Sequence, residues 1–137
     1  MATVALTTAD RVYIVQSLQQ LTGVAVEAIE AGAAVRIDTT TGKWTNANGS
    51  SAGEARVIGI ATRSVAAGEA LTVLKKGILD GFALASQAYD LPIYMSDTDA
   101  TLDDGTGSTV DVAVGRVIPA FATTLGTAAD KLLLVDL

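Results

Sequence analysis

Internal similarity is the feature that most constrains how this chain can fold. The segment Val35–Leu74 reappears in a loose form over Ile93–Leu134. In each copy a short apolar run is followed by a turn rich in Asp and Thr and then by a polar loop that contains glycine. The tripeptide Arg-Val-Ile follows in both copies, at 56–58 and at 116–118, and leads to a closing apolar run. The repeat therefore predicts two related β units.

The two units fit into one domain. A chain of 137 residues falls in the usual size range of a single domain and can bury a sizeable core. We place the units at about 34–76 and 92–135, inside one β domain that covers 23–137. Residues 1–22 lie outside the repeat. We expect them to form an N-terminal arm or an extra strand or helix.

Short apolar runs of Val, Ile, Leu and Ala, separated by Gly, Asn, Asp and Ser clusters, indicate strands throughout the chain. The expected strands are 24–30, 34–39, 43–45, 56–62, 71–75, 78–84, 91–96, 110–122 and 131–137. In the first of them, Val24 and Val26, with Ala28, should lie on one face. Strand edges must be paired, closed or covered, so we predict an all-β fold, either a small β-barrel or a two-sheet sandwich.

One segment leaves room for a short helix. From Asp10, which could cap a helix, apolar residues recur at every third position up to Gly23. These residues are Val12, Val15, Leu18 and Leu21. The run Val12–Val15 would serve equally well as a strand, and periodicity alone does not decide between the two. We therefore expect at most one short helix.

The absence of histidine and cysteine limits the chemistry of the chain. It excludes nucleophilic systems that depend on histidine, and it removes nearly every zinc, haem or iron-sulfur site. Paired carboxylates could still act as acid and base, but such sites usually need a cleft with aromatic platforms, and only 4% of the residues are aromatic. We expect no enzyme activity, no cofactor and no metal.

Two local motifs resemble reactive or metal-binding sites. The segment 49–53 matches the G-x-S-x-G pattern of hydrolases, but a loop without histidine is better explained as a turn. Asp97 and Asp99 resemble the start of an EF-hand loop. Leu102 stands where that loop needs glycine, and Ser108 replaces its closing glutamate. We therefore predict a solvated turn here.

Charge and hydropathy bear on partners. The net charge is −6, and the only adjacent cations are Lys75 and Lys76, which argues against binding nucleic acid. Charged residues interrupt every apolar run before it reaches the length of a membrane span, and residues 1–9 lack the features of a secretory signal. We expect no membrane partner. Trp44, the only tryptophan, should form a lid on the core, the alternative being an exposed anchor for a partner.

The order of four motifs is similar to that of the capsid decoration (cement) proteins of tailed phages. The motifs are Ala31–Asp38, Ala55–Ala61, Leu91–Thr98 and Val114–Ile118. They consist of turn and core residues, and the likeness covers about 23–137. Ile93 and Met95 replace the valine and leucine that are usual in the family, and both replacements conserve volume.

The resemblance implies a function. It implies a protein that is made in the host cytoplasm and decorates the outer surface of the virion as a homotrimer. There it would bridge subunits of the major capsid protein and stabilise the head. The alternative is a receptor- or carbohydrate-binding β module of a head fibre or tail, although the scarcity of aromatic residues argues against sugar binding.

The N-terminal segment 2–21 is the candidate contact region. Strand addition supplies affinity through backbone hydrogen bonds, so this segment could serve as an attachment arm or as a strand between protomers. The residues expected to contact the capsid or a second protomer are Val4, Leu6, Arg11, Val12, Tyr13, Ile14 and Val15.

Overall fold

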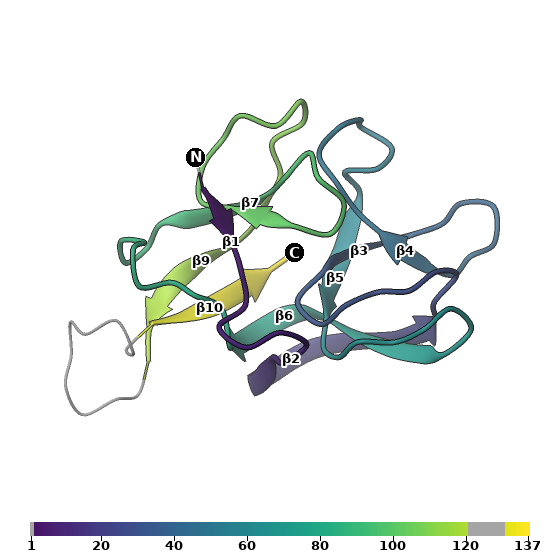
Figure 1. Cartoon of the computed structure of the whole chain (residues 1–137), viewed down its shortest axis with the longest axis horizontal. Coiled ribbons are helices and arrows are strands. Elements are labelled where there is room, and N and C mark those ends of the chain that lie inside the picture. Colours follow the sequence, from purple (N-terminus) through teal and green to yellow (C-terminus); the bar gives the residue numbers. More distant parts are fainter. Residues whose placement is uncertain (1, 121–130) are drawn as a thin grey trace.

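The computed structural model describes residues 2–120 and 131–137, which form one curled antiparallel sheet (Figure 1). Its strands are β1 (Thr3–Val4), β2 (Tyr13–Val24), β3 (Ala34–Ile37), β4 (Trp44–Asn46), β5 (Val57–Ala61), β6 (Ala70–Asp80), β7 (Pro92–Met95), β8 (Leu102–Asp103), β9 (Ala113–Pro119) and β10 (Lys131–Asp136). The described residues contain no helix. The sheet forms a half-barrel, so the expectation of an all-β fold is confirmed.

The same order of strand pairing occurs twice. In the first half of the sheet β3 pairs with β4 and β5, and β5 pairs with β6. In the second half β7 pairs with β8 and β9, and β9 pairs with β10. Figure 1 shows the two sets side by side, with β6 and β2 along the base. The last two residues of the strand expected over 110–122 lie outside the described residues.

The registers of the two units also agree. In the first unit Val35 faces Gly59, and the register shifts at the next residue of β3. In the second unit Ile93 faces Gly115, and the register shifts at the next residue of β7. Gly59 therefore corresponds to Gly115.

This correspondence corrects the alignment of the two Arg-Val-Ile tripeptides. Ile60 pairs with Leu74 on β6, and Arg116 pairs with Leu134 on β10. Arg116 therefore corresponds to Ile60 and not to Arg56. The tripeptides looked equivalent because both are β-prone, but the pairing partners across the sheet determine the true register.

Strand β6 joins the two units as one strand, where the sequence predicted two, at 71–75 and 78–84. Its first half pairs with β5 and its second half with β10, while β2 pairs along its whole length. The polar residues Lys75 and Lys76 interrupt the apolar run, which favoured a break at this point. Pairing on both edges keeps the backbone extended across the interruption.

The segment that could have been a helix is strand β2. Its pairing with β6 contains register shifts that leave Val15 and Leu18 without a facing residue. These two bulges explain why apolar residues recur at every third position in a strand. The strand also continues to Val24, past the boundary expected at residues 22 and 23.

The segment 24–30 is not the regular strand that was expected, and the face that Val24 and Val26 share is exposed. Within it, Ala25 forms an isolated bridge to Trp44 of β4, and Ile29 forms one to a residue of the loop between β5 and β6. Both are fully buried, whereas Val24 and Val26 are exposed. The inward position falls on Ala25 because its backbone N–H bonds to the carbonyl of Glu69 beside β6.

The core consists of two apolar clusters. The larger contains residues of both units, among them Ile60, Leu74, Ile93 and Leu133. The smaller is built around Trp44, whose side chain is 7% exposed. The indole N–H of Trp44 donates a hydrogen bond of 2.9 Å to the carbonyl oxygen of Leu71, so the expectation of a core lid is confirmed.

Candidate interaction surface

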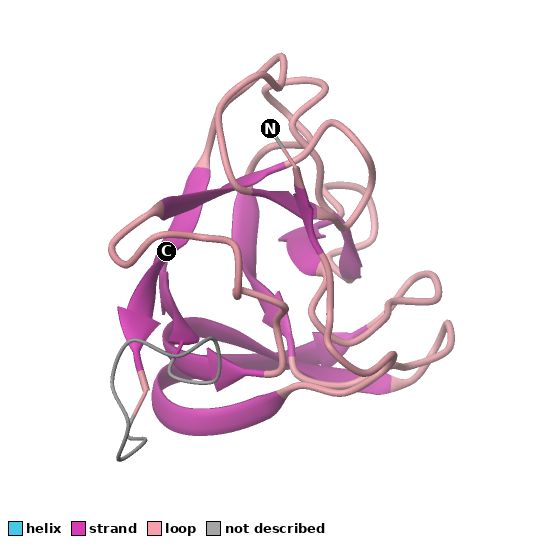
Figure 2. Cartoon of the chain, turned by 60° about the vertical axis from the view of Figure 1, so that its left-hand side comes forward, coloured by secondary structure: helices cyan, strands magenta, loops and turns pink. Residues whose placement is uncertain are grey.

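Strand β2 lies at the edge of the sheet, and its first eight residues are covered on neither face. Every residue from Tyr13 to Gln20 is exposed, which in a strand means that both faces meet solvent. One edge pairs with β6, and no strand among the described residues pairs with the other. Figure 2 shows a long strand that curves along the base, away from most of the loops. Backbone donors and acceptors on its free edge are therefore available to a partner.

The exposed side chains of β2 are largely apolar. The exposed fractions are 55% for Tyr13, 43% for Ile14, 41% for Val15 and 68% for Leu18. We call these four residues the β2 surface. Single exposed apolar residues are common on proteins, but four within six positions of one strand, spread over its two faces, are a concentration that points to a contact strand.

The β2 surface lies in a long segment without charge. No acidic or basic residue occurs between Arg11 and Glu27, although the whole chain carries a net charge of −6. Natural edge strands are usually protected by charged residues, especially Lys, or by Pro. β2 has none of these residues and relies on its two bulges alone, so its edge is poorly protected against pairing.

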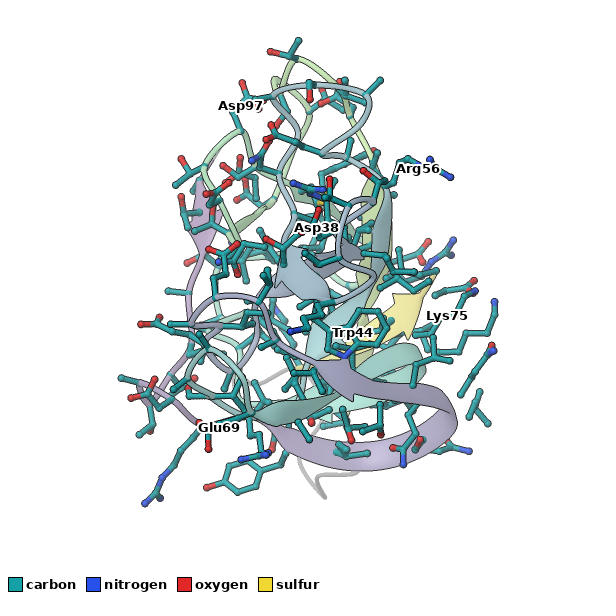
Figure 3. The ribbon with its side chains drawn as sticks, turned by 90° about the vertical axis from the view of Figure 1, so that its right-hand side faces the viewer. Asp38, Trp44, Arg56, Glu69, Lys75 and Asp97 are labelled. Atoms are coloured by element: carbon teal, nitrogen blue, oxygen red, sulfur yellow. The ribbon has the colours of Figure 1, made fainter. Side chains whose placement is uncertain are left out.

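Contacts at its C-terminal end fix β2 to the core. The hydroxyl groups of Thr22 and Thr72 share a hydrogen bond of 2.8 Å across the β2–β6 pair. At Gly23 a Cβ atom would lie 2.7 Å from the indole of Trp44, so only glycine lets β2 pass under the ring. Figure 3 shows the ring of Trp44 directly above this strand.

The structure separates the expected contact residues into two groups. Tyr13, Ile14 and Val15 belong to the exposed β2 surface, and Arg11 beside it is exposed as well. The others lie elsewhere in the fold.

Three of the expected contact residues belong to the body of the domain. Val4 lies on β1, which pairs with β8, and its side chain is buried in the larger core cluster. Leu6 forms a bridge to Phe82, and Leu6 and Val12 pack against the same cluster. Val4 is therefore not offered to a partner. Residues 2–12 fold onto the domain and do not form a separate arm.

The end of the molecule opposite β2 carries acidic loops, and Figure 3 shows Asp97 there. The carboxylates stabilise these loops one by one. Asp97 accepts a hydrogen bond of 3.0 Å from the backbone N–H of Thr109. Asp111 accepts two, of 3.1 and 3.2 Å, from the backbone N–H groups of Gly107 and Ser108. Charge is therefore distributed unevenly along the molecule, with the uncharged strand β2 at one end and acidic loops at the other.

Two further carboxylates have lowered pKa values because they accept hydrogen bonds. The backbone N–H of Ala2, and next the side chain of Gln87, lower the pKa of Asp104 below its ordinary value. The hydroxyl of Thr41, and next the backbone N–H of Thr40, lower the pKa of Asp38. Hydrogen bonds to the ionised form favour that form, so these groups stabilise turns and the N-terminal segment.

The segment 49–53 forms a turn, as expected. The hydroxyl of Ser51, at the serine position of the G-x-S-x-G pattern, donates to the carboxylate of Glu54 and accepts from its backbone N–H, both at 3.4 Å. The neighbouring hydroxyl of Ser50 donates to Asn48 and Glu54. In the part of the chain that the structure describes, no three carboxylates come together in a way that could hold a metal ion.

A cleft of about 480 Å³ lies between the N-terminal segment and the loop 99–102. Its walls include Leu6 and Phe82, and three carboxylates, those of Asp10, Glu30 and Asp99, also line it. The other lining residues are small or apolar ones and two threonines.

Comparison with known protein families, curated proteins and solved structures found no match to this chain. No helix in its described part is long and apolar enough to cross a membrane.

Proposed function

We propose that this chain is a decoration protein of a tailed-phage capsid. It binds the outer surface of the shell, bridges neighbouring subunits of the major capsid protein and stabilises the head. The observation that supports this best is the long, uncharged β2 edge, which exposes Tyr13, Ile14, Val15 and Leu18 in the part of the strand that is covered on neither face. The motif order that resembles decoration proteins gives the class of partner.

The fold suits a role that depends on contact alone. A bridging protein needs a rigid body and surfaces that adhere, and it needs no catalytic group. Several copies that each make weak contacts with a repeating lattice bind strongly together, because each later contact forms at high effective concentration. The curled sheet provides the rigid body, and the free edge of β2 provides backbone groups for strand addition.

The charge distribution suggests how the protein sits. Acidic loops such as those around Asp97 and Asp111 are strongly hydrated and costly to bury. Strand β2 itself has no charged residue and does not carry this cost. We therefore place strand β2 against neighbouring protein, with the acidic loops facing solvent.

The test uses capsids lacking this chain, to which purified protein is added at increasing concentration. We expect the number of bound copies to saturate at a value set by the capsid lattice, and the bound shells to withstand higher temperature before they release DNA. Absence of binding, or binding without a gain in heat resistance, would overturn the proposal. Saturation at a handful of copies per particle would also overturn it, in favour of a receptor- or carbohydrate-binding module of a fibre or tail.

A further inference from the structure

We infer that the β2 surface is the contact between copies of this chain, so that β2 of one copy lies against β2 of another. The inference rests on the proposed function only in treating β2 as a contact strand. It names the occupant of that strand as a second copy and does not require a capsid.

Strand β2 exposes apolar side chains that a neighbouring molecule could bury. Strands gain stability by burying at least one face, and β2 buries neither over Tyr13–Gln20. Leu18, the most exposed large apolar residue in the described part of the chain, projects from a bulge at the middle of this strand. A neighbour that covers Leu18 and the residues around it removes this apolar area from water.

Electrostatics favours contact between two copies through β2 over contact through other parts of their surface. Each copy carries a net charge of −6, so two copies repel at most orientations. Fifteen consecutive residues, 12–26, carry no charge. When two β2 strands meet, no like charges are pressed together along their length, and the acidic loops point away from the contact (Figure 3).

The bulges of β2 limit the size of the assembly that copies can form through this strand. Flat, regular edges stack without end, whereas bulges twist an edge and restrict what can pair with it. The bulges at Val15 and Leu18 give β2 an irregular outline. Contact between β2 strands therefore favours a small closed assembly over a filament.

The fold of the chain provides a matched pair of variants. Ile14 on β2 and Ile37 on β3 are the same residue type, and both side chains are 43% exposed. Arginine at either position should leave the fold intact, because each side chain already reaches solvent. Only the change on β2 introduces charge into the proposed contact.

The first experiment measures the mass of the free protein by size-exclusion chromatography with light scattering. We expect a multiple of 13.9 kDa for the wild type and for Ile37→Arg, and a monomer for Ile14→Arg and Leu18→Arg. Circular dichroism and thermal unfolding check that the variants are folded. A monomeric wild type, or an oligomer that persists in both β2 variants, would overturn the inference.

The second experiment uses the absence of cysteine in the chain. A single cysteine is introduced as Leu18→Cys, at the middle of β2, and in a control as Ile37→Cys. Treatment with a short bismaleimide should join Leu18→Cys copies at low protein concentration and leave Ile37→Cys copies separate. Equal cross-linking of both variants, or of neither, contradicts contact at β2.

Failure of this inference is distinguishable from failure of the proposed function. If the free protein is monomeric and Leu18→Arg abolishes its binding to capsids, then β2 docks on the shell itself. In that case the inferred contact between copies is wrong, and the proposal that the chain is a decoration protein is retained. If the copies associate through β2 but do not bind capsids, the contact between copies holds and the proposed decoration function is wrong.

Discussion

Gly59 and Gly115 occupy the same position in the two β units, and each lies against the carbonyl oxygen of a leucine on the neighbouring strand. A Cβ atom on Gly59 would lie 2.9 Å from the oxygen of Leu74, and one on Gly115 would lie 1.8 Å from the oxygen of Leu134. Leu74 and Leu134 are themselves equivalent residues of β6 and β10. The two units therefore share a close approach of backbones that only glycine permits.

Replacing either glycine with alanine should destabilise the protein. We expect losses of about 1–3 kcal/mol for Gly59→Ala and a larger loss for Gly115→Ala, where the overlap with the backbone is more severe. Gly53→Ala is the control, because an added Cβ would meet nothing within 4 Å there. Urea denaturation gives the free energies of unfolding. Equal effects at all three positions would contradict the close approach.

The duplicated architecture could be predicted from sequence, but its register could not. The order of motifs in the two halves was enough to show two related β units in an all-β fold. The alignment failed at Arg56 and Arg116, because identical tripeptides carry no information about which residue faces them across the sheet. The pair that defines the register is Gly59 and Gly115, each of which faces a buried β-branched residue.

The candidate surface was found only in part. The apolar run at Tyr13–Val15 could be recognised from sequence, and it is exposed. Val4 was included because it is apolar and N-terminal, yet it pairs through β1 with a strand far along the chain and is buried. Leu18 was missed, because a spacing of three residues suggested a helix with a buried face. Bulges, which arise from pairing with β6, cannot be seen in a single strand's sequence.

Changes at Trp44 should separate packing from hydrogen bonding. Trp44→Phe keeps a buried ring but leaves the carbonyl of Leu71 without its indole donor, which should cost about 1–3 kcal/mol. Trp44→Ala also creates a cavity, and about 3–5 kcal/mol should be lost. Calorimetric unfolding measures both. A variant Trp44→Phe as destabilised as Trp44→Ala would show that the hydrogen bond, and not the packing, dominates.

The same residue reports on folding directly. Because Trp44 is the only tryptophan and is 7% exposed, native fluorescence should peak at short wavelength and shift to the red on unfolding. Native emission typical of a fully hydrated indole would contradict its position in the core.

Stability should fall in acid, in part through Asp104. Its pKa is lowered in the folded protein, chiefly by the backbone N–H of Ala2, so the unfolded state binds more protons as the pH falls below about 4. The stabilisation is complete above the ordinary pKa of aspartate and is lost as the pH passes through the lower, folded value. We expect Asp104→Asn to be less stable than the wild type at pH 7, and the difference to shrink as the pH is lowered below the ordinary pKa of aspartate. Urea midpoints across this range measure it, and a constant difference would refute the assignment.

The attachment of β2 to β6 depends on Gly77. This residue faces Ser17, and a Cβ atom on it would lie 2.3 Å from the carbonyl oxygen of Gln16. Gly77→Ala should therefore push β2 away from β6 at its centre, while the contacts at Thr22 and Gly23 still hold its C-terminal end. We expect faster hydrogen exchange of the β2 amides around Gln16, with little change in β9. Gly42→Ala provides a comparison, because it also places alanine at a positive φ but has open space around it. If both variants left exchange in β2 unchanged, the close approach of Gly77 to Gln16 would not be what positions the contact strand.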